Sequence, residues 1–356
     1  MRIASIDSRV ESFELSRPYS IAYKSVDAVD NVIVEIRTES GEVGLGAASP
    51  APYVTGETDV SCRDSLGGGT LDWLVGKDVR TLPALCRCLI QALPDNPAAR
   101  AAVDVALHDL YARSIGLPLV EVLGRAHDSL PTSITIGIRS VEETLEEARE
   151  YIGRGFVVIK VKVGKSLTVD LERLHRLRET VGAGIGIRVD ANQGYTRGEL
   201  LRFVAETEPL GIELIEQPLL AADIHGMRSL PERVRRRIAA DESLLAERHA
   251  LELSRPPVAC GIYNIKLMKC GGIHSARRIA DVADAVGIDL MWGCNDESVI
   301  SIAGALHVAL ACPATRYLDL DGSLDLARDV AAGGFRIDAG RMYTIDAPGL
   351  GLRSLD

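Results

Sequence analysis

From about residue 132 onward, short apolar runs rich in β-branched residues alternate with segments of helical periodicity. Eight such runs can be distinguished, beginning with TSITIG and VVIKVKV and ending with GIDLMWGC and TRYLDLDG. Segments such as TVDLERLHRLRETVG lie between them and have the spacing of amphipathic helices. Strands that alternate with helices in this way predict a closed parallel (β/α) barrel. A doubly wound open sheet is the alternative, although no G-x-G-x-x-G motif follows the first strand of a βαβ unit.

The chain before these repeats has the pattern of an α+β domain. Residues 1–50 contain strand-like runs of antiparallel style, including NVIVEIRTES and GEVGLGAA, which are separated by a turn at Gly41. The segment SRPYSIAYKSVDAVD is polar and aromatic and is expected to form a loop between strands. Helical periodicity follows over residues 55–125, where the clearest helix starts at Pro97 and stops at Gly116.

Charge and cysteine usage exclude several classes of function. The net charge of −10 and the pI near 5.3 argue against a nucleic-acid partner. No signal-peptide core and no stretch of about 18 uncharged apolar residues is present, so we expect a cytoplasmic protein without a membrane partner. The seven cysteines form no C-x-x-C pair and are expected to be buried, reduced thiols, not zinc ligands or disulfides. The sequence leaves a homo-oligomer open.

The run VVIKVKVG at residues 157–164 has the pattern of a buried strand but contains two lysines. Side chains alternate between the two faces of a strand, so Lys160 and Lys162 share one face while Ile159 and Val161 share the other. On an exposed edge strand, two such lysines would be an ordinary solvated face. In a barrel they require partners of opposite charge.

Charged residues recur at the predicted C-terminal ends of successive strands. Asp190, Glu216, Asp241 and Lys266 follow one another at intervals of 25 or 26 residues, and Lys162 precedes the first of them by 28. Each interval is one strand–helix unit. Equivalent positions on neighbouring barrel strands converge at the C-terminal mouth, where active sites of this fold are built. We therefore expect these side chains to form an arc around one cavity.

Three carboxylates in this arc would repel one another unless a cation lay among them. Singly, Asp190, Glu216 and Asp241 would each be explained by a helix cap or an ion pair, but three in phase favour an oxygen-ligand site for Mg²⁺. The strands that flank them carry lysines on both sides. We expect the pKa of these lysines to be lowered, which would let them act as general acid and base near neutral pH.

At this point the sequence resembles the enolase superfamily, in particular the subgroup of muconate-lactonizing enzymes. The motifs that carry the resemblance are KVKVG, RVDAN, IEQP, AADES and YNIKLMKCGG. The resemblance implies an α/β fold: a modified (β/α)₇β barrel of the TIM type with an N-terminal α+β capping domain completed by the C-terminal tail. The implied domains are residues 1–124 for the capping domain, 125–322 for the barrel and 323–356 for the segment that returns to the capping domain.

The resemblance also implies the roles of these residues. One Mg²⁺ per subunit, held by Asp190, Glu216 and Asp241, would bind a substrate carboxylate and stabilise an enediolate, which is the general pattern of the superfamily. Lys162 and Lys266 would act on opposite faces of the α-carbon, with Lys160 assisting electrostatically. A His–Asp base, as in the mandelate racemase subgroup, is disfavoured because the sixth strand offers Lys266. Lys269 is expected to be helical or peripheral and is left out of the site.

The stretch YLDLDG at residues 317–322 distinguishes among the activities of this subgroup. Its two acids, Asp319 and Asp321, lie on one face at the end of the last strand. In dipeptide epimerases, which this stretch resembles, a D-x-D pair receives the free α-ammonium of the substrate. Muconate lactonization, o-succinylbenzoate synthesis and N-acylamino-acid racemization offer no ammonium, so two buried acids would be a liability there. We therefore expect epimerisation of the C-terminal residue of a dipeptide.

Substrate preference is harder to read from the sequence. Tyr19 and Lys24 belong to the segment that closes over the substrate in this family, and Lys24 would suit an Ala-Glu dipeptide. Asp296, after the seventh strand, lies where an apolar residue is expected and would suit a basic side chain; capping of the next helix is its alternative. Thr135 on the first barrel strand is a further candidate for substrate binding.

Three other activities remain open. L-Ala-D/L-Glu epimerase, N-succinylamino-acid racemase and o-succinylbenzoate synthase would use the same catalytic residues. A further alternative is a binding protein: a barrel that binds metal and ligand but catalyses no reaction. Schiff-base chemistry from one lysine would leave the three carboxylates unexplained.

Overall fold

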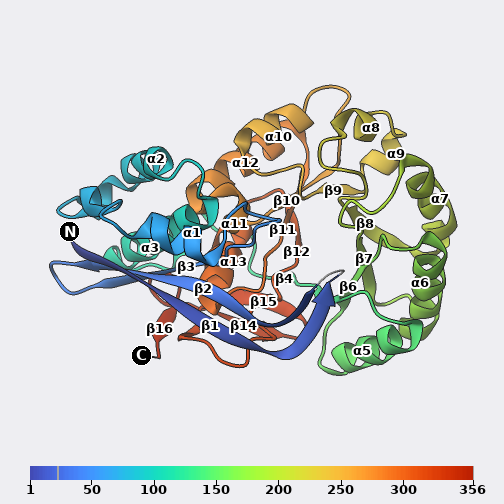
Figure 1. The fold of residues 1–356 in the computed structure, drawn as a ribbon, viewed down its shortest axis with the longest axis horizontal. Helices are drawn as coiled ribbons and strands as arrows, with labels where there is room; N and C mark the ends of the chain where they lie inside the picture. The colour runs from blue at the N-terminus through green and yellow to red at the C-terminus, as the bar shows by residue number, and fades with distance from the viewer. Residues whose placement is uncertain (22–23, 356) are drawn as a thin grey trace.

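The computed structural model describes residues 1–21 and 24–355, without the side chains of residues 18–21, 24 and 25 (Figure 1). Eight parallel strands form one sheet in chain order, and neighbouring strands are hydrogen-bonded throughout. The last strand also meets the first, because Thr132 forms a parallel bridge with Leu318 and the Ser133 N–H donates to the Leu318 carbonyl at 3.0 Å. The predicted barrel is thus confirmed. Its strands are β5 (Ile134–Ile136), β6 (Val158–Lys162), β7 (Gly186–Asp190), β8 (Ile212–Glu216), β9 (Ile238–Ala240), β10 (Ile262–Ile265), β11 (Asp289–Trp292) and β12 (Thr315–Leu318).

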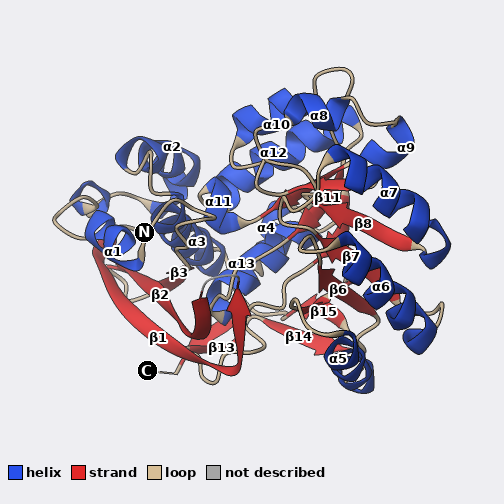
Figure 2. Cartoon of the chain, turned by 45° about the vertical axis from the view of Figure 1, so that its right-hand side comes forward, coloured by secondary structure: helices blue, strands red, loops and turns tan. Residues whose placement is uncertain are grey.

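Helices follow the first seven strands and cover the outside of the barrel (Figure 2). The last strand, β12, is followed by no helix before the C-terminal strands among the described residues, which gives the modified (β/α)₇β order. Several helix starts follow from local sequence: Ser140 and Thr196 each form a capping box with the glutamate three residues later. The helices are α5 (Val141–Gly153), α6 (Leu167–Val181), α7 (Arg197–Thr207), α8 (Ile224–Arg228), α9 (Glu232–Arg235), α10 (Glu247–Leu253), α11 (Leu267–Cys270), α12 (Ile273–Val286) and α13 (Val299–Leu310).

The capping domain packs a three-stranded antiparallel sheet on helices. Its strands are β1 (Ile3–Ile21), β2 (Lys24–Thr38) and β3 (Val43–Ala48), and its helices are α1 (Asp59–Leu66), α2 (Leu82–Ala92), α3 (Pro97–Ser114) and α4 (Leu119–Leu123). Helix α3 crosses β3 so closely that a Cβ at Gly46 would lie 1.8 Å from the Ala102 carbonyl oxygen. Only glycine allows this approach.

The segment of residues 16–30 differs from the predicted loop. Its described residues continue β1 and β2 as one long hairpin, with pairs such as Phe13↔Val29 and Ser20↔Ser25 and a register shift between Glu14 and Tyr19. Pairing satisfies the backbone groups that a polar loop would leave to water. Figure 1 shows this hairpin reaching from the capping domain to the barrel.

The C-terminal segment contacts both the capping domain and the barrel. The Ala327 N–H donates to the Glu14 carbonyl at 2.8 Å, and Arg113 on α3 donates to the Leu352 carbonyl at 3.0 Å. Four short strands follow: β13 (Ala331–Gly333) pairs with β16 (Leu352–Ser354), and β14 (Phe335–Asp338) pairs with β15 (Arg341–Thr344), which also pairs with β4 (Leu130–Pro131) at the barrel entry. In the part of the chain that the structure describes, no helix is long and apolar enough to cross a bilayer.

Candidate active site

The structure places the predicted lysines and carboxylates at the C-terminal ends of neighbouring strands. Lys162 pairs in register with Asp190, and Asp190 pairs with Glu216 on the following strand. Asp241 follows β9 directly, and Lys266 follows β10. The carboxylates and Lys160 are nearly inaccessible to solvent, whereas the Lys162 side chain is 31% exposed. Lys160 is therefore the deeper of the two lysines on β6, as the sequence predicted.

Each lysine of β6 has carboxylate partners at the ends of other barrel strands. Lys160 Nζ forms an ion pair with Asp319 and lies 3.4 Å from Glu216 Oε2 and 3.9 Å from Asp190 Oδ2. Lys162 Nζ donates to Asp190 Oδ2 at 2.6 Å and to the Asn192 side-chain oxygen at 3.0 Å. Lys160 thus sits among three acids in the barrel interior, while Lys162 holds one acid at the mouth.

Two lysines of the β10 end share Asp241. Lys266 Nζ lies 3.0 Å from Asp241 Oδ2, and Lys269 Nζ forms an ion pair with Oδ1 of the same carboxylate. Lys269 is helical, as one of the two expected alternatives, but leaving it out of the site was wrong, because its side chain is buried against Asp241. Its spacing of three from Lys266 was the available signal, because residues three apart on a helix share a face.

Burial and mutual repulsion control the protonation of the acids and lysines. Burial, together with the charge of Asp190, raises the pKa of Glu216 to about 8. Burial lowers the pKa of Lys160 and of Lys266, but the surrounding carboxylates, Asp319 first for Lys160 and Asp241 first for Lys266, raise both pKa values above the ordinary range. The lowering that the sequence predicts is for lysines packed near a divalent cation, and it stays a prediction.

The acid set fits a hard divalent cation. Asp190, Glu216 and Asp241 offer only oxygen donors, and Glu242 beside them has a buried side-chain oxygen, Oε2, without a hydrogen-bond partner. Among the described residues, the oxygens of the three carboxylates are not all within 4.8 Å of one another. Each instead has an oxygen bound by a lysine. At the ends of β6 to β10 and β12, the acids outnumber the lysines, which favours the binding of a cation: the acids are Asp190, Glu216, Asp241, Glu242, Asp319 and Asp321, and the lysines are Lys160, Lys162, Lys266 and Lys269.

The two acids of the D-x-D stretch are held in different ways. Asp319 accepts a hydrogen bond from the Ser133 hydroxyl at 2.6 Å and pairs with Lys160. Asp321 accepts from the backbone N–H of Thr135 at 2.7 Å, so the structure places Thr135 as a support of this acid. Burial raises the pKa of Asp319, but the larger opposing effect of Lys160 and its hydrogen bonds leaves this pKa below its ordinary value. Burial and the charge of Asp319 raise the pKa of Asp321 to about 6.

Polar side chains that the sequence did not single out support the site. The Asn264 amide donates to Glu216 Oε1 at 2.8 Å, and the Gln217 side-chain oxygen accepts from the Asp241 N–H at 3.0 Å. Arg188, buried on β7, donates to the Leu318 carbonyl at 2.6 Å where the barrel closes. Arg188 and Asn264 occupy positions inside predicted strands, where a buried polar residue signals a required partner.

The remaining specificity candidates lie on the capping side. Asp296 is half-buried in the segment between β11 and α13, and its carbonyl oxygen accepts from the Ser49 hydroxyl at 2.9 Å. The start of α13 is capped by Ser298 and Asp329, which disfavours capping as the role of Asp296. The side chains of Tyr19 and Lys24 lie outside the described part of the structure.

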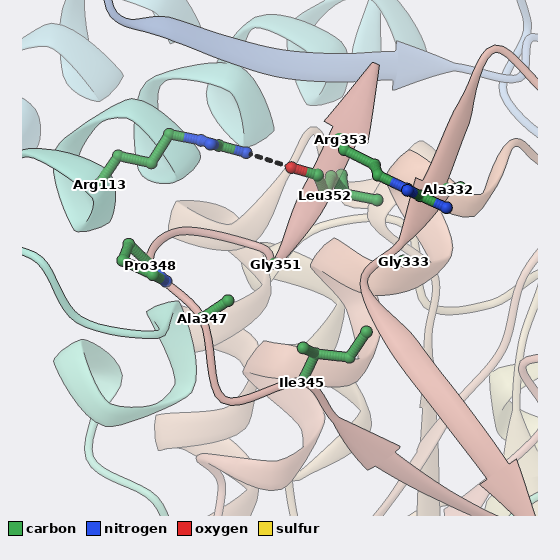
Figure 3. A pocket seen from close by; sticks show the side chains of 9 residues that line it. All are labelled: Arg113, Ala332, Gly333, Ile345, Ala347, Pro348, Gly351, Leu352 and Arg353. Carbon is green, nitrogen blue, oxygen red and sulfur yellow. Dashed lines mark hydrogen bonds between the residues drawn. The ribbon is translucent and has the colours of Figure 1, made fainter. Parts of the chain in front are cut away.

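Two other features lie away from the strand ends. Cys86, Asp104 and His108 have side-chain atoms within 4.8 Å of one another in the capping domain, where Asp104 caps the start of α12 by accepting from the Ile273 N–H at 2.6 Å. A cavity of about 490 Å³ lies between α3 and the C-terminal segment (Figure 3). Its lining includes Arg113 and Arg353 but no carboxylate, so it does not resemble the acid-rich site.

A barrel whose strand ends carry acids between two sets of lysines defines a class: a metal-assisted enzyme that moves protons next to a carboxylate. The chain belongs to the mandelate racemase / muconate lactonizing enzyme family, whose N-terminal domain matches residues 5–124, while residues 143–355 match the enolase C-terminal domain-like family.

The cysteines of this chain are all free, and Cys88 is exposed, against the expectation that all are buried.

Several proteins similar to this chain over nearly its full length are dipeptide epimerases. An L-Lys-D/L-Arg epimerase of Methylococcus capsulatus is 61% identical, with 99% of each chain covered. The crystal structure of the dipeptide epimerase of that organism, complexed with Mg and the dipeptide L-Arg-D-Lys, superposes with a TM-score of 0.97 over 99% of each chain. An L-Ala-D/L-Glu epimerase of Bacillus subtilis is 34% identical, with 99% of this chain and 97% of that protein covered.

Proposed function

We propose that the protein is a Mg²⁺-dependent dipeptide epimerase that inverts the α-carbon of the C-terminal residue and prefers basic side chains. The observation that carries the proposal is the pairing of two catalytic lysines with an acid-rich mouth that also holds Asp319 and Asp321. The relatives named for Lys and Arg dipeptides support the preference for basic side chains. Mg²⁺ would be held by Asp190, Glu216 and Asp241 and would supply stabilisation of the negative charge that develops on the substrate carboxylate.

The lysines carry the proton transfer. One of Lys162 and Lys266, in its amine form, takes the α-proton, and the C–H electron pair passes into the carboxylate to give an enediolate. The other lysine, as an ammonium ion, returns a proton to the opposite face of the same carbon. Lys160, fixed by Asp319 and Glu216, places a further positive charge near this negative centre. The inverted residue leaves with its bonds otherwise unchanged.

The two acids after β12 define the substrate class. Asp321 is held by a backbone N–H and retains acceptor capacity, so a free α-ammonium group can bind there. An N-succinyl group has no cation to offer and would bring another carboxylate toward these acids. The site therefore favours a dipeptide over an N-succinyl amino acid.

Deuterium incorporation tests this function. The protein is incubated in D₂O with Mg²⁺ and a library of dipeptides and N-succinyl amino acids, and the mass of each residue is measured. We expect a mass gain of one deuterium on the C-terminal residue of Lys- and Arg-containing dipeptides. Exchange on N-succinyl amino acids without exchange on any dipeptide would overturn the proposal.

Replacing Asp296 tests the preference for basic side chains. Asp296→Asn removes a carboxylate from the half-buried segment after β11. We expect kcat/KM for dipeptides with Lys or Arg to fall by roughly 10- to 100-fold, because a hydrogen bond to a charged group contributes about 1.5–3 kcal/mol. The value for Ala-Glu should not fall. Steady-state kinetics with the basic residue placed first or second in the dipeptide shows which end Asp296 contacts.

Asp281→Asn is the matched control, since it removes one carboxylate from the exposed face of α12, not from the strand ends. Equal losses of kcat/KM for basic and acidic dipeptides in the Asp296 variant would show that Asp296 does not select the side chain.

A further inference from the structure

Lys269 is buried at the site but has no donor left for a substrate. It lies on α11, the four-residue helix that follows Lys266, and its side chain is 1% exposed. Its ammonium group donates to Asp241 Oδ1, to the Asp241 carbonyl at 2.7 Å and to the Asn264 carbonyl at 3.1 Å. An ammonium group has three donors, and all three have acceptors here. Lys269 therefore differs in kind from Lys266.

The two oxygens of Asp241 are divided between the two lysines. Lys269 binds Oδ1, while Lys266 lies 3.0 Å from Oδ2. The backbone of Asp241 is also held, because its N–H donates to the side-chain oxygen of Gln217. Rotation of the carboxylate would leave a buried ammonium group short of an acceptor, which is costly in a dry site.

The helix that carries Lys269 is anchored by the capping domain. Arg100 on α3 donates to the Cys270 carbonyl at 3.2 Å. A Cβ at Gly271 would lie 2.1 Å from Arg100 Nε, so the glycine allows this close approach. Asp104 then caps the next helix through the Ile273 N–H. Lys269 is thus held from both of its ends, by its acceptors at the barrel mouth and by α3 behind it.

We propose that Lys269 is a positioning residue that fixes the orientation of Asp241 for binding a divalent cation. It contacts neither the substrate nor the reacting proton in this assignment, which rests on the proposed Mg²⁺ site. Groups that orient metal ligands in this way typically affect metal affinity by about 10- to 100-fold.

Metal binding measured without substrate tests the proposal. Lys269→Met and Lys269→Gln are titrated with Mg²⁺ alone by calorimetry, and the melting temperature of each is recorded with and without Mg²⁺. We expect the dissociation constant for Mg²⁺ to rise by about 10- to 100-fold and the stabilisation by Mg²⁺ to shrink accordingly. Turnover should fall at low Mg²⁺ and recover in large part at saturating Mg²⁺. Lys77→Met, an exposed lysine of the capping domain, is the matched control.

Two further variants separate positioning from a general structural role. Lys269→Arg keeps a cation with several donors and should retain more Mg²⁺ affinity than Lys269→Met. In an Asp241→Asn background, adding Lys269→Gln should weaken Mg²⁺ binding no further, because both changes act on one interaction.

Each outcome decides the question. A folded Lys269 variant that binds Mg²⁺ with native affinity overturns the proposal, and so does failure of all three single variants to fold in excess Mg²⁺, since Lys269 would then maintain the fold. If the native protein itself binds no Mg²⁺, it is the proposed function that fails.

Discussion

Alanine at Lys162 or at Lys266 is expected to abolish epimerisation, lowering its rate at least about 10³-fold in both directions. The two lysines lie at opposite ends of the row of acids, one bound to Asp190 and the other to Asp241. Inversion needs a base on one face of the α-carbon and an acid on the other, so the loss of either lysine stops it. Chiral chromatography of the dipeptide product measures this rate.

Isotope exchange distinguishes the two lysines. Each alanine variant keeps one base, so it should still exchange the α-proton of one epimer with D₂O, and the two variants should differ in the epimer that exchanges. Lys165→Ala, an exposed lysine in the segment that follows β6, is the control and should behave as the native protein does. Undiminished epimerisation in either site variant would refute the two-base assignment.

Removing the divalent cation is expected to have a comparable effect. A chelator should lower turnover at least about 10³-fold, which corresponds to about 4 kcal/mol of transition-state stabilisation, and added Mg²⁺ should restore it. Without a cation, the enediolate charge would develop beside acids that already outnumber the lysines at this mouth. Because Mg²⁺ binds only the folded protein, saturating Mg²⁺ at about 100 times its dissociation constant should also add about 2.7 kcal/mol to stability.

Glu216→Gln should reproduce the chelated state even with Mg²⁺ present. Glu216 is fully buried between Asp190 and the end of β9, and the amide keeps its size while it removes the charge. Glu172→Gln, on the exposed face of α6, controls for loss of a carboxylate in general. Activity that survives both chelation and the Glu216 variant would exclude a metal-assisted mechanism. Turnover at graded Mg²⁺ concentrations and thermal melting measure both effects.

The fold could be predicted largely from periodicity, because each barrel strand is a short buried run followed by an amphipathic helix. The convergence of Lys162, Asp190, Glu216 and Lys266 followed from equal spacing, since equivalent positions of parallel strands meet at one end of a barrel. Both inferences use only local pattern and chain order. For that reason they needed no knowledge of side-chain contacts.

The supporting residues could not be predicted in the same way. Lys269 lies on a helix of one turn. Its role at the site comes from three acceptors, two on Asp241 after β9 and one on Asn264 of β10. The raised pKa values of Lys160 and Lys266 depend on the sum of several charges at particular distances, which spacing does not supply. Residues 16–30, at the end of the β1–β2 hairpin, were predicted as a loop because their polar composition hid the cross-strand pairing.

The hydrogen bonds that attach the segment after β11 to the capping domain have a consequence for how such enzymes diversify. Ser49 and Asn31 both donate to the carbonyl of Asp296, so residues of the first domain hold the backbone that carries this acid. Lys160, Lys162, Asp190 and Glu216, by contrast, form their hydrogen bonds with other residues of the barrel. A descendant of this chain could therefore acquire a new substrate by paired changes in these two segments while inheriting its proton-transfer chemistry intact.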